Sequence, residues 1–73
     1  MAQLVTAILS NQDELAAKAR MVTGDVNEAG ILVGKVVSRA FETFDQRAHA
    51  DDISHGMRSE MDRLIRELRR RTN

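Results

Sequence analysis

The chain of 73 residues contains no cysteine, proline, tryptophan or tyrosine. Without cysteine it has neither a disulfide framework nor a thiolate metal site. Without proline, and with only four glycines, helices can run uninterrupted through most of the sequence. Two phenylalanines are too few aromatic side chains for a β-sandwich or barrel, or for a surface on which nucleic-acid bases stack. These absences predict a single all-α domain over residues 1–73.

Net charge is absent as well, because eleven lysine and arginine residues balance eleven aspartate and glutamate residues. The protein therefore has no overall field that would attract nucleic acid or an anionic membrane. The charges are unevenly placed, however. Residues 41–55 hold four acidic side chains and one arginine, whereas residues 57–73 hold six arginines and three acidic side chains. Such asymmetry can orient a partner or a second copy of the same chain.

The first nine residues are mostly apolar, but they lack the positive charge of a signal peptide and are too few to cross a bilayer. We therefore expect a cytoplasmic protein that makes no membrane contact. Apolar residues recur at helical spacing from Leu4 to Val22, which predicts a helix. This segment is either one helix from Ala2 to Val22 or two helices, if Ser10 caps a second one.

A tight turn follows, and with the next helix it predicts a helical hairpin. Gly24 stands where a left-handed residue commonly ends a helix. Asp25 precedes Glu28 by three residues, a pattern typical of a helix start. The second helix then carries a broad apolar stripe of Leu32, Val33, Val36, Val37, Ala40, Phe41 and Phe44. Helices joined this closely are antiparallel or steeply crossed.

Gly30 and Gly34 lie one turn apart on a face of the second helix beside this stripe. Each lowers the helix propensity of the segment by about 1 kcal/mol. Two interpretations stay open: chance surface glycines, or a face bare of side chains where another helix can approach closely.

A polar loop is predicted at about 45–56, with the acidic cluster inside it. Gly56 then opens a third, amphipathic helix. Its apolar stripe consists of Met57, Met61, Leu64, Ile65 and Leu68. The predicted fold is thus a small three-helix domain, a helical hairpin plus this third helix.

Candidate chemical sites are few. His49 and His55, with Asp51 and Asp52 between them, have the side chains of metal ligands, but their spacings match no zinc or calcium pattern. We therefore predict no metal site, no cofactor and a solvated loop. No nucleophile and base stand at a recognisable spacing, and three short helices offer little concavity, so we predict no catalytic residue and no enzyme.

The arginines of the third helix are the candidate contacts to nucleic acid. They are Arg58, Arg63, Arg66, Arg69 and Arg70. Phosphate binding is one interpretation, which would make DNA a weak partner of the chain alone. The other is a solvated helix end, where arginines complement the negative end of the helix dipole and acidic neighbours partly neutralise them.

Residues 15–29 read LAAKARMVTGDVNEA, and residues 28–41 read EAGILVGKVVSRAF. These runs resemble region 2 of bacterial sigma factors of the extracytoplasmic-function class. In that family a helix ending in AR-x-L-TGD precedes a phrase of the form A-E-D-L-V-Q-E-x-F-x-R-A. The resemblance covers roughly residues 12–44, with weaker agreement over residues 57–71, where the family has its promoter-recognition helix.

The family's acidic and amide positions in this phrase face RNA polymerase, and the matching residues here are Gly30, Ile31, Gly34 and Lys35. A tryptophan expected early in the third helix is replaced by Glu60. The resemblance therefore implies a sigma-like regulatory module that binds a protein, either the polymerase or an anti-sigma-like regulator, and not a complete sigma factor. The alternative is a small homodimeric helical interaction protein unrelated to transcription.

Overall fold

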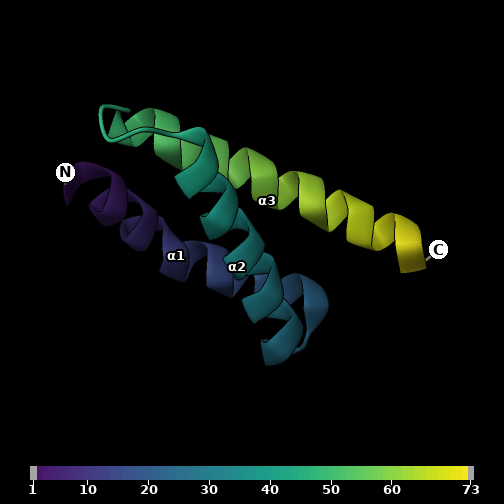
Figure 1. The fold of residues 1–73 in the computed structure, drawn as a ribbon. Coiled ribbons are helices and arrows are strands. Elements are labelled where there is room, and N and C mark those ends of the chain that lie inside the picture. The colour runs from purple at the N-terminus through teal and green to yellow at the C-terminus, as the bar shows by residue number, and fades with distance from the viewer. Residues whose placement is uncertain (1, 73) are drawn as a thin grey trace.

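Three helices make up the protein (Figure 1). The computed structural model describes the backbone of residues 2–72 and the side chains of residues 4–71. Helix α1 spans Ala2–Thr23, α2 spans Val26–Thr43 and α3 spans Ala50–Thr72. No strand occurs in residues 2–72. The predicted all-α, three-helix fold is confirmed, although residues 1 and 73 of the predicted domain lie outside the described residues.

Helix α1 runs without interruption through Ser10. The Ser10 hydroxyl donates a hydrogen bond to the Thr6 carbonyl oxygen at 2.7 Å, one turn back in the same helix. A side chain that bonds backward in this way cannot cap a new helix ahead of it. The single-helix interpretation of this segment is therefore correct, and the alternative break at Ser10 is wrong.

The turn between α1 and α2 has the predicted chemistry. Gly24 has φ of +68°, and its amide donates to the Arg20 carbonyl at 2.8 Å, which closes the end of α1. The Asp25 carboxylate accepts a hydrogen bond from the Asn27 amide at 2.8 Å and so caps α2. The Asp25 amide donates to the Thr23 hydroxyl at 3.2 Å. Local main-chain and side-chain interactions thus account for both helix ends.

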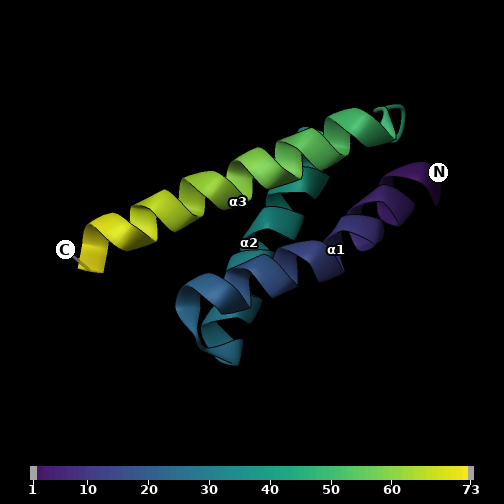
Figure 2. The same ribbon diagram turned by 180° about the vertical axis from the view of Figure 1, so that it is seen from behind.

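Helix α3 runs parallel to α1, because three contacts join residues at a nearly constant sequence separation of 43 or 44. Figure 2 shows the two helices extending in the same direction, with α2 running obliquely from the α1–α2 turn toward the first half of α3. The contacts are Asn11–Ser54, Glu14–Arg58 and Lys18–Asp62, at 2.8, 3.1 and 2.6 Å. They advance by about one helical turn each time, which sets the register of α3 on α1.

Helices α1, α2 and α3 all contribute to one apolar core. Its buried members are Leu4, Ala7, Ile8, Leu15, Ala19, Ala29, Leu32, Val33, Val36, Ala40, Ile53, Met57, Met61, Leu64 and Ile65. Asn11 is buried among them, and its side-chain amide donates to the Ala7 carbonyl at 2.7 Å as well as to Ser54. Because both donors are satisfied, this polar group can be buried at modest cost.

The polar loop predicted at about 45–56 is shorter than expected. Helix α3 begins at Ala50, and only residues 44–49 connect it to α2. Two features of the sequence explain the difference. Asp51 and Asp52 occupy the first turn, where negative charge favours the positive helix end. Ile53 is fully buried one turn before Met57, so it extends the apolar stripe backward and gains burial energy that keeps this segment helical.

Candidate protein-interaction surface

The outer face of α2 carries the four positions predicted to bind a partner. Gly30, Ile31, Gly34 and Lys35 are all exposed. A methyl group added at Gly30 or Gly34 would meet no atom within 4 Å, so no other part of the described chain packs closely against either glycine. Ile31 leaves 59% of its surface exposed. This face is an open, mostly uncharged strip of helix.

Ile31 and Lys35 also border a groove between the α1–α2 turn and the C-terminal half of α3. The groove consists of two cavities of about 470 and 150 Å³ that share three lining residues. We call it the basic groove, since three basic side chains and one acidic side chain line it. Its lining residues are Met21, Val22, Thr23, Glu28, Ile31, Leu32, Lys35, Leu68, Arg69 and Arg71.

The apolar part of the basic groove is accessible from outside. Leu32 and Leu68 belong to the core or pack against it, and Val22 packs beside them. Met21 stands at the edge with 87% of its surface exposed. Apolar side chains in a concave surface with charged residues at the margin can receive apolar side chains of a partner and fix their orientation.

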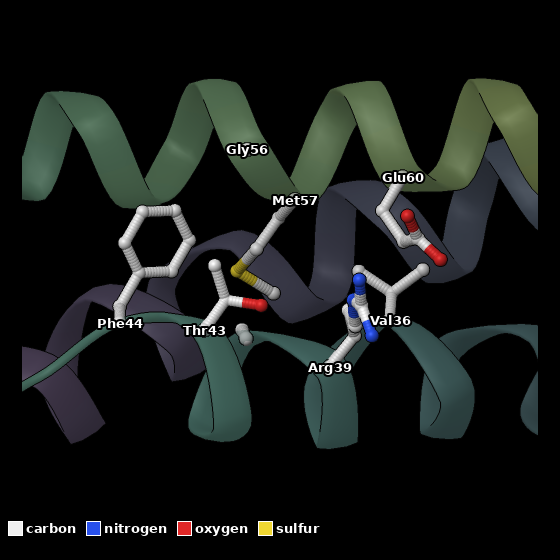
Figure 3. Close-up of a pocket in the computed structure, with 8 residues that line it drawn as sticks. Val36, Arg39, Thr43, Phe44, Gly56, Met57 and Glu60 are labelled. Carbon is white, nitrogen blue, oxygen red and sulfur yellow. The ribbon is translucent and has the colours of Figure 1, made fainter.

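Another cavity, of about 230 Å³, lies between the C-terminal half of α2 and α3 (Figure 3). At one end the Phe44 ring lies against Gly56, where an added methyl carbon would be only 2.5 Å from the ring's Cζ atom. At the other end Arg39 lies opposite Glu60. The absence of a side chain at Gly56 is what allows the Phe44 ring to approach α3.

Glu60 forms an ion pair with Arg63 through two hydrogen bonds. Nε and Nη2 of Arg63 donate to its two carboxylate oxygens at 3.2 and 2.5 Å. This hydrogen-bonded arginine holds the pKa of Glu60 below its ordinary value, and the charges of Arg63 and Arg39 act in the same direction, while partial burial opposes them. The pKa of Arg63 is raised, chiefly by its hydrogen bond to Glu60. Both groups are held in their charged forms, which suits an ion pair and not a proton-transfer site.

The five arginines predicted to contact nucleic acid are not equally available. Arg58 pairs with Glu14 at 3.1 Å, and Arg63 pairs with Glu60 and, at 3.2 Å, with Glu67. Arg69 also takes part in an interaction within the chain. Arg66 and Arg70 are exposed, one turn apart. Carboxylates therefore already engage two of the five candidate phosphate contacts.

The histidines and aspartates considered as metal ligands lie around the start of α3. His49, Asp51, Asp52 and His55 are exposed. Among the described residues, no three His, Cys, Asp or Glu side chains gather closely enough to hold a metal ion.

Seven residues that line the basic groove were not among the predicted site residues: Met21, Val22, Thr23, Glu28, Leu32, Leu68 and Arg71. Leu68 belongs to the apolar stripe predicted for the third helix, and Arg71 is one of the six arginines of residues 57–73. Nothing in the sequence singles out Met21 as a surface residue, because methionine is also a common core residue. Residues of the α1–α2 turn and of α3 come together in the groove because the C-terminal half of α3 lies beside that turn.

None of the helices in the described part of the chain is long and apolar enough to span a membrane. The resemblance to sigma factors has no support from other proteins and stays a prediction. Compared with protein-family models, with curated proteins and with solved structures, the chain matches none.

Proposed function

We propose that the chain is a sigma-factor-like module of transcription regulation that acts in the cytoplasm by binding another protein, without catalysis. The outer face of α2 is the proposed binding surface. RNA polymerase or an anti-sigma-like regulator is the proposed partner. We do not propose a complete sigma factor, because Gly30, Ile31, Gly34 and Lys35 replace the acidic and amide side chains that face polymerase in that family.

The open space around Gly30 and Gly34 is the observation that supports this proposal most. Each glycine lowers helix stability by about 1 kcal/mol relative to alanine, and neither is required by a close contact within the described chain. A bare helix face lets a second helix approach closely enough for extensive van der Waals contact. Ile31 beside them supplies an exposed apolar side chain for such a contact.

Binding to DNA is a secondary part of the proposal. Arg66 and Arg70 are exposed near the C-terminal end of α3, where they can reach phosphates. With so few contacts, affinity should be weak and should fall only modestly as salt rises, because the salt dependence scales with the number of phosphate contacts. Unchanged affinity in a variant with Arg66→Gln and Arg70→Gln would rule out this role.

The alternative, a homodimeric interaction protein unrelated to transcription, is favoured by one observation. Six large apolar side chains are at least 45% exposed, and association with a second copy would bury some of them. Sedimentation at several concentrations tests this alternative, because a strict monomer would exclude it.

Affinity capture from the native cell extract tests the proposed function. The bait is the tagged chain, compared with a variant carrying Gly30→Gln and Gly34→Gln. An added Cβ atom meets no other atom within 4 Å at either position, so the variant should fold and be more helical. We expect the unmodified bait to recover polymerase subunits or an anti-sigma protein, and the variant to recover neither.

A matched control carries Ala17→Gln and Ser59→Gln, at exposed positions on α1 and α3. It should behave like the unmodified bait, since neither position lies on α2. The proposal is overturned if the unmodified bait recovers neither polymerase nor an anti-sigma protein. It is also overturned if the glycine variant recovers them equally well.

A further inference from the structure

Both ends of the molecule carry exposed apolar side chains. The protein is elongated, with extents of 40 × 19 × 16 Å. The start of α1 and the α2–α3 connection share one end, while the C-terminus of α3 lies toward the other (Figures 1 and 2). The exposed Val5, Leu9 and Phe41 belong to the first end, because α1 begins and α2 finishes there. The exposed Met21, Val26 and Ile31 flank the α1–α2 turn, near the other end.

The same two ends carry opposite charge. Around the α2–α3 connection, residues 41–55 hold four acidic side chains and one arginine. We call this region, with Glu42, Asp45, Asp51 and Asp52, the acidic end. At the opposite end, residues 66–71 hold four arginines and one glutamate. Helix dipoles account for part of this placement in α3, but they do not account for Glu42, which lies in the last turns of α2 where a negative charge is unfavourable.

The basic groove lies at the positively charged end. Its apolar floor includes Leu32 and Leu68, and Lys35 and Arg71 stand at its margin. Neither of these two basic side chains forms an ion pair within the described chain. A ligand that fits would bring acidic groups to the margin and apolar side chains to the floor.

We infer that the acidic end of one copy docks in the basic groove of the next copy, so that the chains associate head to tail. The occupant has both required properties, because the acidic end combines four carboxylates with the exposed Phe41. The two contacting surfaces are different, so the contact is heterologous and leaves a free end on each side. Assembly therefore continues into longer oligomers or closes into a ring. Ile31 and Lys35 belong both to the basic groove and to the proposed binding surface on α2. The inference therefore rests in part on the proposed function, with a second copy of the chain as one partner of that surface.

Two pairs of charge-removing substitutions test this contact by sedimentation velocity. The groove variant carries Lys35→Gln and Arg71→Gln. The acidic-end variant carries Glu42→Gln and Asp52→Asn. All four side chains are exposed, so both variants should stay folded, which circular dichroism checks. For the unmodified protein we expect an average mass that rises with concentration and falls as salt rises from roughly 0.05 to 0.5 M.

Each variant alone should associate more weakly than the unmodified protein, by about tenfold or more, since two charged contacts are lost. An equimolar mixture should associate again. The groove variant retains its acidic end and the acidic-end variant retains its groove, so the mixture forms pairs and stops there. A control with Ala17→Glu and Ser59→Glu has the same net charge as the groove variant but changes neither end. It should associate like the unmodified protein.

The inference is overturned if the unmodified protein stays monomeric at low salt, if either variant alone associates normally, or if the mixture fails to pair. These results leave the proposed function separately testable, because the capture experiment uses substitutions of Gly30 and Gly34, which neither association variant carries. Loss of capture with intact self-association would refute the proposed function and keep the head-to-tail contact.

Discussion

Replacing three helical glycines by alanine, one at a time, tests how α2 and α3 pack. At Gly30 and Gly34 the added methyl group meets no atom within 4 Å. Alanine restricts the unfolded chain and favours the helix, so each substitution should raise the free energy of unfolding by about 0.5–1 kcal/mol. For a domain of this size that corresponds to a rise in melting temperature of about 4–8 °C per kcal/mol.

At Gly56 the same substitution should have the opposite or no effect. The new methyl carbon would lie 2.5 Å from Cζ and 2.9 Å from Cε2 of Phe44, closer than carbon atoms can approach. The ring has to leave its place against α3, and such overpacking costs about 1–3 kcal/mol. Set against the helical gain, the net result ranges from no change to a loss of about 2 kcal/mol.

Urea denaturation followed by circular dichroism measures all three variants, with the same substitutions repeated in a Phe44→Ala background. Without the ring, Gly56→Ala should stabilise the protein as Gly34→Ala does, and the resulting double-mutant cycle gives the coupling energy between Gly56 and Phe44. If Gly56→Ala stabilises the intact protein as much as Gly34→Ala, the Phe44 ring does not pack against α3 and the described cleft is wrong.

Three further predictions address the other contacts of α3. Ile53→Ala should lower the free energy of unfolding by about 2–5 kcal/mol in a urea titration, because Ile53 is fully buried, whereas a residue in a solvated loop would cost less than about 0.5 kcal/mol. Asn11→Ala should cost about 1–3 kcal/mol and Ser54→Ala less, since Asn11 keeps its bond to the main chain when Ser54 is removed; thermal melts of both variants compare them. Because Arg63 lowers the folded-state pKa of Glu60, their pair stabilises the protein above the unfolded-state pKa of about 4.3 and loses this contribution as pH falls through the lower folded value. Unfolding measured from neutral to acidic pH should show a smaller acid-induced loss for Glu60→Gln, and an unchanged loss would contradict the pairing.

Some features of the candidate surface can be predicted from helical periodicity in the sequence, and others depend on contacts between helices. The exposed positions of Gly30 and Gly34 follow from the phase of the apolar stripe on α2, which is a local property. The pairing of Arg63 with Glu67 also follows from helical spacing. The pairing of Arg58 with Glu14 does not follow from helical spacing, because it joins residues of two different helices and depends on how α3 packs against α1.

The sequence by itself determined the helices and the hairpin, because their causes are local: the apolar period, the left-handed Gly24 and the capping carboxylate of Asp25. Only the tertiary structure decided where α3 begins. The polar residues around Ile53 are typical of a loop. They form a helix here because the core formed by the other helices buries the Ile53 side chain. It also decided the register between α1 and α3, which depends on contacts between residues more than forty positions apart. From that register follow the basic groove and the separation of charge between the two ends, since both require knowing how far α3 extends past its neighbours.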